Sequence, residues 1–317
     1  MSDRILEKIL NDFQNSDASV VENKQIFLKN IAELGKQKIN ILLVGATGVG
    51  KSSTINAIFD AEVAKVGYSP NPETASIEKY EIDNIVLWDS PGLGDSPEND
   101  RKYATQIANI LKATDDDGNL LIDEVVVLID GSNRDMKTAY EILENVIIPY
   151  MNEPDRIVIA INQCDMGLKG RYWRYDTNCP EEQLVQFMDE KVISVRNRIL
   201  ETTGVMTMPI YYSALHKYNI SKLLFTMIKS MPETKRFLFA DAINRDPNVW
   251  RKNDELSNYN QEIQKEIKGS LSKALDGAAK GAVAGATVGG LIPIVGPVVG
   301  AAVGAALGFL GGLIEGK

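Results

Sequence analysis

Apolar positions change their spacing along the chain in a way that predicts alternating strands and helices. Short continuous apolar runs that end in glycine or polar residues are typical of buried parallel strands. Longer segments with apolar residues at helical spacing lie between them. The predicted strands are residues 39–44, 76–82, 85–89, 124–130, 156–161 and 208–212. The predicted helices are residues 51–59, 135–151, 181–202 and 219–230. This order indicates an α/β fold whose mostly parallel sheet is covered on both faces.

The second and third strands are expected to pair as a hairpin, because Asp83-Asn84 between them is a tight-turn signal. Helices are expected on both sides of the α/β unit. Residues 3–36 read as two helices, and residues 232–276 are charged and helical in pattern. We therefore divide the chain into an N-terminal helical segment, a central domain, a helical connector and a hydrophobic tail. Their boundaries are 1–37, 38–232, 233–276 and 277–317.

The tail shows the sharpest change of composition in the chain. Residues 281–314 carry no charge and are rich in Gly, Ala and Val. Glycine recurs at every fourth position from 277 to 289 and again from 296 to 312, as in small-residue stripes that let helices approach closely. Pro293 and Pro297 predict a break between two halves, and therefore a glycine-zipper helical hairpin. We expect it to associate with a membrane, although a hairpin buried against protein is the alternative.

Bulk composition narrows the function without deciding it. The 317 residues carry a net charge of −9, which argues against a nucleic-acid partner. The two cysteines, Cys164 and Cys179, do not suggest a disulfide framework. The N-terminus has charges throughout and is not a secretory signal. We expect the protein in the cytoplasm, or on the inner membrane through the hairpin.

A phosphate-binding loop is predicted between the first strand and the first central helix. Gly45-Ala-Thr-Gly-Val-Gly-Lys-Ser52 fits G-x-x-x-x-G-K-[ST] in that context. Backbone amides there can converge on phosphate oxygens, helped by the helix N-terminus. Lys51 is expected to reach the β- and γ-phosphates, and Ser52 to bind Mg²⁺. The expected nucleotide contacts in this loop are Gly45, Thr47, Gly48, Val49, Gly50, Lys51, Ser52 and Ser53.

Two further loops are expected to sense Mg²⁺ and the γ-phosphate. Asp89 ends a strand and can hold Mg²⁺ directly or through water. The Gly92 N–H is placed to contact a γ-phosphate, and Gly94 lets the loop move. Thr74 is our choice for a loop hydroxyl that completes the Mg²⁺ shell, with Ser69 and Ser76 as neighbouring alternatives. Lys51, Thr74 and Gly92 are thus the predicted catalytic residues.

The base is expected to be read at the ends of the last two strands. Asn162-Gln163-Cys164-Asp165 follows the fifth strand, and Ser213-Ala214 follows the sixth. The Asp165 carboxylate can accept hydrogen bonds from guanine N1 and N2, a donor pair that adenine lacks. A site built for that pair rejects analogues without it. The backbone of Ser213-Ala214 can meet the guanine O6.

Taken in order, these motifs resemble the five G-motifs of translation-factor-class GTPases. Within that class, residues 38–232 resemble the Era/TrmE/septin-like group, particularly the prophage-associated GTPases of enterobacteria. The resemblance implies a Ras-like P-loop G domain that binds GTP or GDP with Mg²⁺ and hydrolyses GTP slowly. It also implies pairing across the nucleotide face, because the G-x-T-G-x-G-K-S form is similar to septin and immune-associated GTPases. We therefore expect a homo-oligomer, formed through the G domain or the tail.

Several positions depart from the family pattern. Gln163 stands where the family has Lys, Leu93 where Ras-like proteins carry the water-orienting Gln, and Gly48 where potassium-activated members have Asn. The residue that positions the attacking water is therefore unidentified. Arg101, Arg134 and Arg171 are candidates for a trans-acting arginine by loop position only, and solvated surface arginines are the simpler reading. His216, the only histidine, is expected to pack locally.

Three functions remain open from the sequence. The first is a membrane-associated GTPase switch that oligomerises. The second is a soluble GTPase that acts in ribosome or RNA assembly. The third is a nucleotide-latched membrane effector with little turnover.

Overall fold

The structure is a computed structural model. It describes residues 6–7, 9–10, 21–59, 77–94, 96–115, 117–133, 136–151, 153–244, 246, 249–250 and 259–283. The predicted hairpin from residue 284 onward, most of the first predicted helix, Thr74 and Arg134 lie outside these residues. Among the described helices, none has both the length and the apolar character that crossing a membrane requires.

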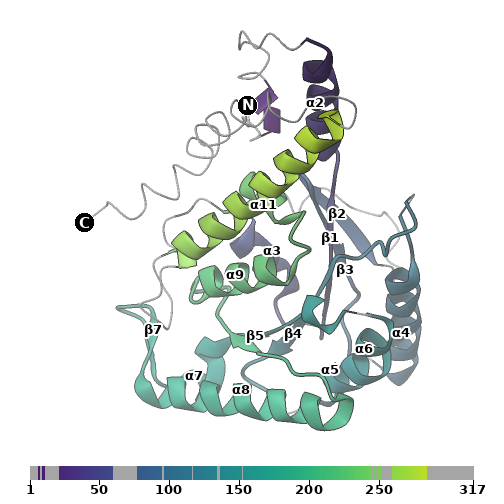
Figure 1. Ribbon diagram of the computed structural model, residues 1–317. Coiled ribbons are helices and arrows are strands. Elements are labelled where there is room, and N and C mark those ends of the chain that lie inside the picture. Colours follow the sequence, from purple (N-terminus) through teal and green to yellow (C-terminus); the bar gives the residue numbers. More distant parts are fainter. Residues whose placement is uncertain are drawn as a thin grey trace.

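A six-stranded sheet forms the centre of the protein, with helices on both faces (Figure 1). Its strands are β1 (Ile39–Gly45), β2 (Glu78–Ile82), β3 (Ile85–Asp89), β4 (Glu124–Asp130), β5 (Ile157–Asn162) and β8 (Ile210–Tyr211). Their order across the sheet is β2-β3-β1-β4-β5-β8. Only the β2–β3 pair is antiparallel, and Asp83 in its turn has a φ of 51°. The predicted α/β class, the mostly parallel sheet and the β-hairpin of the second and third strands are confirmed.

Alternate strand residues enter two hydrophobic cores, one on each face of the sheet. On β1, Ile39, Ile41 and Leu43 face the first core, whereas Leu42 and Val44 face the second. This alternation follows from the two-residue period of a strand. The second core is closed by α4 (Pro97–Lys112), α5 (Lys137–Ile142), a π-helical turn at Leu143–Ile147, α6 (Ile148–Tyr150) and α8 (Glu182–Thr203). Short 3₁₀ turns at Pro154–Arg156 and Cys164–Met166 flank β5.

The first core joins the sheet to helices from both ends of the described chain. Helices α3 (Lys51–Ile58) and α9 (Ile220–Ser230) pack here with α2 (Val21–Leu34), the 3₁₀ turn Arg236–Ala240 and α11 (Tyr259–Val283). Figure 1 shows α11 as a long helix that runs past α9 to α2. Ile263, Ile267, Leu271 and Leu275 recur every fourth residue on α11 and are fully buried. The helical segments at the two ends therefore share a core with the sheet.

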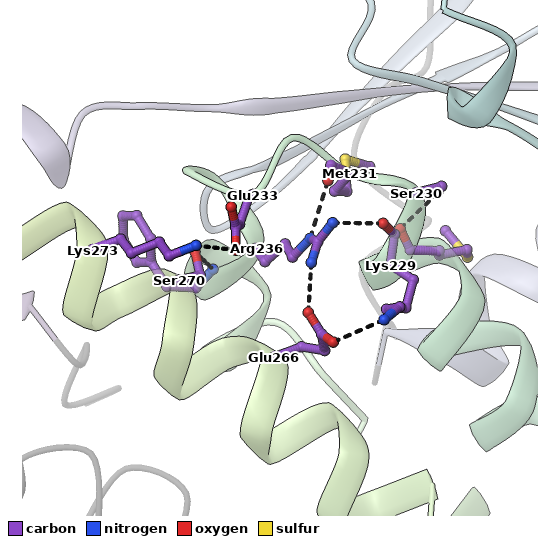
Figure 2. Close-up of polar contacts among 10 residues, drawn as sticks. Lys229, Ser230, Met231, Glu233, Arg236, Glu266, Ser270 and Lys273 are labelled. Atoms are coloured by element: carbon purple, nitrogen blue, oxygen red, sulfur yellow. Dashed lines mark hydrogen bonds and ion pairs between the residues drawn. The ribbon is translucent and has the colours of Figure 1, made fainter.

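An ion cluster fastens α11 to the turn after α9 (Figure 2). Arg236 binds Glu266 of α11 and also donates to the carbonyls of Met231 and Lys229. Ser270 Oγ accepts from the Phe237 amide at 3.0 Å. Such contacts supplement the apolar stripe and define the register of α11 against the domain.

Two elements were not predicted from the sequence. Helix α4 begins after Ser96, whose hydroxyl accepts from the Asn99 amide, and it has Pro97 in its first turn. The sequence does contain signals for this helix, which are the Ser96 cap, Pro97 and the apolar residues Tyr103, Ile107 and Leu111 that the structure buries. The polar first half of the segment obscured these signals. The second element is a small hairpin, β6 (Trp173–Arg174) with β7 (Cys179–Pro180), which follows the short helix α7 (Gly167–Gly170).

Candidate nucleotide-binding site

The predicted site segments gather at the carboxyl ends of the parallel strands. The loops after β1, β3, β5 and β8 carry the phosphate motif, Asp89, Asn162–Asp165 and Ser213–Ala214 respectively. Parallel strands place these loops at one edge of a sheet, the usual ligand position in such folds. Hydrogen bonds connect these four loops, as described below. Thr74 is the predicted site residue for which the structure describes no position.

The phosphate loop has the backbone shape that its glycines permit. Gly48 and Gly50 have φ values of 79° and 94°, a region that L side chains rarely occupy. A Cβ on Gly50 would lie only 2.4 Å from Asn162 Nδ2, so the base loop presses against this position. Lys51, Ser52 and Ser53 begin α3, with both serines exposed. The amides at this helix start can converge on an anion.

Lys51 and Asp89 place opposite charges at the base of the loop. Lys51 Nζ lies 3.3 Å from the Gly45 carbonyl oxygen. Burial raises the pKa of Asp89 to about 6, the nearby Lys51 ammonium opposes the rise, and Glu78 adds to it. Asp89 Oδ1 is buried and has no hydrogen-bond partner among the described residues. Such an oxygen fits a bound cation.

The protein groups near Asp89 suit Mg²⁺ only if a nucleotide supplies some of the ligands of the metal. No three His, Cys, Asp or Glu side chains of the described residues come together as a metal site. Mg²⁺ usually keeps few protein ligands and shares its shell with substrate phosphates. Asp89 and the exposed Ser52 are therefore adequate protein donors for a metal that arrives with a nucleotide.

The loop after Asp89 pairs with the phosphate loop like a short extension of the sheet. The Leu93 amide donates to the Gly45 carbonyl at 3.3 Å, and the Thr47 amide donates to the Leu93 carbonyl at 3.1 Å. The Leu93 side chain is buried in the core beneath. Leu93 therefore faces away from solvent and cannot orient a water. A Cβ on Gly92 would lie 2.1 Å from Thr47 Oγ1, so only glycine fits this close approach.

Asn162 joins the phosphate and base loops through one buried side chain. Its Nδ2 donates to the Val49 carbonyl at 2.8 Å, and its Oδ1 accepts from the Ala214 amide at 3.0 Å. Gln163 adds a second link, because its Nε2 donates to the Gly48 carbonyl at 2.8 Å. The residue at the usual lysine position thus reaches the phosphate loop.

Asp165 lies within the 3₁₀ turn Cys164–Met166, in a buried position. Its side chain is buried, with the residue only 5% exposed. His216 Nε2 lies 3.7 Å from its Oδ2. The imidazole also packs against Trp173 of the β6–β7 hairpin, with ring centroids 4.9 Å apart and the ring planes tilted by 34°. Local packing of His216, as predicted, is confirmed, but the contact with Asp165 was not foreseen.

Lys191 is a residue of this region that the sequence analysis missed. It lies on α8, and its buried ammonium donates to the carbonyls of Gly131 at 2.7 Å, Asn133 at 2.6 Å and Asp130 at 3.2 Å. The Gly131 amide in turn donates to the Asn162 carbonyl at 2.7 Å. Burial lowers the pKa of Lys191, and Asp130 opposes that shift. A lysine inside a polar helix pattern gives no signal of such a role.

The two described arginine candidates were chosen by loop position alone. Arg101 lies within helix α4 and not in a loop, so that ground is wrong for it, whereas Arg171 follows α7 as a loop residue; both residues are exposed.

A comparison with protein families matches the part of the chain that carries these motifs. Residues 40–163 match the family model described as 50S ribosome-binding GTPase. No curated protein matches the chain. The match covers the phosphate loop, Asp89–Gly92 and the start of the base loop, which together are less than half of the chain.

Solved structures that resemble the chain do so distantly. A probable GTP-binding protein engB is 20% identical, with a TM-score of 0.40 over 60% of this chain and 97% of that chain. Era from Aquifex aeolicus, bound to GDP and AlF4⁻, is 17% identical, with a TM-score of 0.38 over 78% and 87%. LeoA, a bacterial dynamin GTPase from ETEC, is 12% identical, with a TM-score of 0.40 over 93% and 45%. At these scores the likenesses support no argument about function.

Proposed function

We propose that this protein, a P-loop GTPase that hydrolyses GTP, works as a membrane-associated switch that oligomerises in its GTP-bound state. The nucleotide part of this proposal depends on one observation above all. Asn162 ties the loop that would hold the phosphates to the loop that would read the base. A nucleotide needs both loops at a fixed spacing, and one buried amide provides it.

In the proposed mechanism, each residue has a defined electrostatic task. The amides of residues 48–52 and the Lys51 ammonium hold the phosphates and stabilise the charge that develops on them. Ser52, Asp89 and Thr74 would hold Mg²⁺, which would supply positive charge to offset that of the phosphates. The Gly92 amide contacts the γ-phosphate and so reports whether GTP or GDP is present.

Base selection is assigned to Asp165. Its buried carboxylate would accept from guanine N1 and N2, whereas the Ala214 amide, which the sequence placed near O6, already donates to Asn162 Oδ1 at 3.0 Å. Adenine would leave the carboxylate unpaired in a buried position, which is costly. The protein should therefore bind guanine nucleotides and reject adenine nucleotides.

Calorimetry with GDP and GTP in the presence of Mg²⁺ tests the nucleotide site. Lys51→Ala should abolish binding of both nucleotides, whereas Lys273→Ala on α11 should leave it unchanged. Asp165→Asn should shift preference toward xanthine nucleotides, with the exposed Asp155→Asn as its control. Tight GTP binding by Lys51→Ala, or an unchanged base preference in Asp165→Asn, would contradict these assignments.

The membrane part of the proposal is supported by the uncharged stretch 281–314. As a helix, residues 297–314 would be about 27 Å long, close to the thickness of a bilayer core. A truncation after Val283 preserves α11, whose Ala278 carbonyl accepts from Asn30 Nδ2 at 2.9 Å. Full-length protein should float with liposomes, and more so with a non-hydrolysable GTP analogue than with GDP. The truncated form should bind nucleotide but not float.

A soluble ribosome-acting GTPase is the second candidate, favoured by the description of the matching family. Sedimentation with 50S subunits separates the two. GTP-dependent cosedimentation of the truncated protein with 50S subunits, without flotation of the full chain, would support this second function. Light scattering in the two nucleotide states tests oligomerisation, which should appear with the GTP analogue only.

A further inference from the structure

The β6–β7 hairpin lies against the loop that follows β8. Asn178 Nδ2 donates to the His216 carbonyl at 2.9 Å, and Trp173 meets Tyr218 edge-on with ring centroids 5.6 Å apart. The Glu181 amide donates to the Tyr172 carbonyl at 2.7 Å and closes the base of the hairpin. The hairpin is therefore attached to the same loop that carries Ser213 and Ala214.

These contacts hold the His216 imidazole in one orientation. It packs against Trp173, which is only 5% exposed, with the two ring planes tilted by 34°, and Tyr175 meets it edge-on with ring centroids 6.1 Å apart. Its backbone amide donates to Ser213 Oγ at 3.2 Å. Held in this way, the ring directs its polar Nε2 edge at Asp165 Oδ2, 3.7 Å away.

We propose that His216 is a positioning residue for guanine recognition and that the β6–β7 hairpin is part of the base pocket. This inference depends on the proposed assignment of Asp165 to the guanine edge. A neutral imidazole can carry its proton on Nε2 and donate it to a carboxylate oxygen. A small rotation of either side chain brings the 3.7 Å separation into the hydrogen-bond range of about 2.7–3.2 Å.

The chemical consequence concerns the 2-amino group of the base. Guanine offers N1–H and N2–H side by side, so both Asp165 oxygens have to lie in the plane of the base. A hydrogen bond donated by His216 Nε2 to Asp165 Oδ2 would restrict rotation of the carboxylate and hold it in that plane. Hypoxanthine offers only N1–H and needs only one oxygen. His216 should therefore improve GDP binding more than IDP binding.

A purely structural histidine would behave differently. Loss of its packing against Trp173 would loosen the whole pocket and weaken GDP and IDP equally. The ratio of the GDP and IDP affinities separates these roles, because a general loosening of the pocket would weaken both affinities alike and leave their ratio unchanged.

The test measures Kd for GDP and for IDP, both with Mg²⁺, in the full-length protein and three variants. His216→Phe keeps an aromatic face for Trp173 but loses the donor, whereas His216→Gln keeps a donor, and His216→Ala removes both. His216→Phe and His216→Ala should weaken GDP binding about tenfold and IDP binding by less than about threefold, the loss expected for one hydrogen bond to a charged group. His216→Gln should restore the wild-type ratio within about threefold.

The effect of His216→Phe is also measured in the Asp165→Asn variant, as the matched background. With the carboxylate absent, adding His216→Phe should not change the GDP-to-IDP ratio further. Equal losses of GDP and IDP affinity in His216→Phe, or no rescue by His216→Gln, would overturn the positioning role while the proposed nucleotide site stands. If the wild-type protein binds neither diphosphate, the proposed function and this inference both fail.

Discussion

Asn162 Nδ2 lies 2.8 Å from the carbonyl oxygen of Val49, and through this contact the base loop and the phosphate loop are held together. Both residues are buried, at 2% exposure each. The contact spans more than a hundred positions in sequence, so it forms only when β1 and β5 take their places in the sheet.

Asn162→Ala should weaken GDP and GTP binding at least about tenfold and lower the free energy of unfolding by about 1–3 kcal/mol. Two buried partners, the Val49 carbonyl and the Ala214 amide, would lose their hydrogen bonds. Calorimetry and urea denaturation measure the two effects. Asn197→Ala, an exposed residue on α8, is the matched control and should change neither. Wild-type affinity in Asn162→Ala would show that the two loops are held together by other contacts.

Gly92→Ala should slow GTP hydrolysis more than it weakens GDP binding. The new Cβ would lie 2.1 Å from Thr47 Oγ1 and 2.8 Å from Thr47 Cα, so the loop after Asp89 could not keep its close approach to the phosphate loop. Single-turnover hydrolysis and GDP titration of the same variant give the comparison. Gly269→Ala on α11 has open space at its Cβ and, like Gly92, no positive φ, so it controls for the substitution without the close approach. An equal loss in both glycine variants would remove Gly92 from the reaction.

Glu124 should make the protein less stable as pH rises. Burial raises the pKa of Glu124 well above its ordinary value of 4.5, although the hydrogen bond from Ser230 Oγ at 2.6 Å opposes the rise. Because the folded state holds the proton more tightly than the unfolded state, this contribution is fully present below pH 4.5. It is lost as pH rises through the raised folded-state pKa.

Glu124→Gln should abolish that part of the pH dependence. The difference in free energy of unfolding between variant and wild type should grow in favour of the variant as pH rises above 4.5, toward the raised folded-state pKa. Urea denaturation at a series of pH values measures it. The neighbouring Asp123 serves as a contrast, since it is paired with Lys235 at 2.8 Å. A pH-independent difference would mean that Glu124 keeps the same charge in both states.

Glu266→Gln should loosen α11 from the domain. Glu266 and Arg236 are mostly buried, with 17% and 16% of their side chains exposed, and loss of the carboxylate leaves the guanidinium with only carbonyl partners. We expect a loss of about 1–3 kcal/mol in the free energy of unfolding and faster amide exchange along residues 259–283. Lys273→Met, at the exposed ion pair with Glu233, is the control and should have no measurable effect. Unchanged exchange in Glu266→Gln would show that the apolar stripe alone holds α11.

The local sequence pattern predicted most of the strands, because a continuous apolar run between turn residues is typical of a strand that is buried on both faces of a parallel sheet. The sequence placed β4 at 124–130, as the structure has it, and located the strand ends that carry Gly45, Asp89 and Asn162. It predicted β8 as residues 208–212, whereas the strand is Ile210–Tyr211, and Met208 is 67% exposed. Helix α4 was missed because its polar first half hides a narrow apolar stripe.

The class of fold, the phosphate motif and the order of the site loops could be predicted from the chain, since each depends on residues that are neighbours in it. The side chains that meet across those loops could be identified only from the packed structure. Asn162 against Val49, Lys191 against Gly131 and His216 against Asp165 join residues from separate elements. Their distances depend on how the strands and helices pack, and no periodicity in the chain encodes such packing.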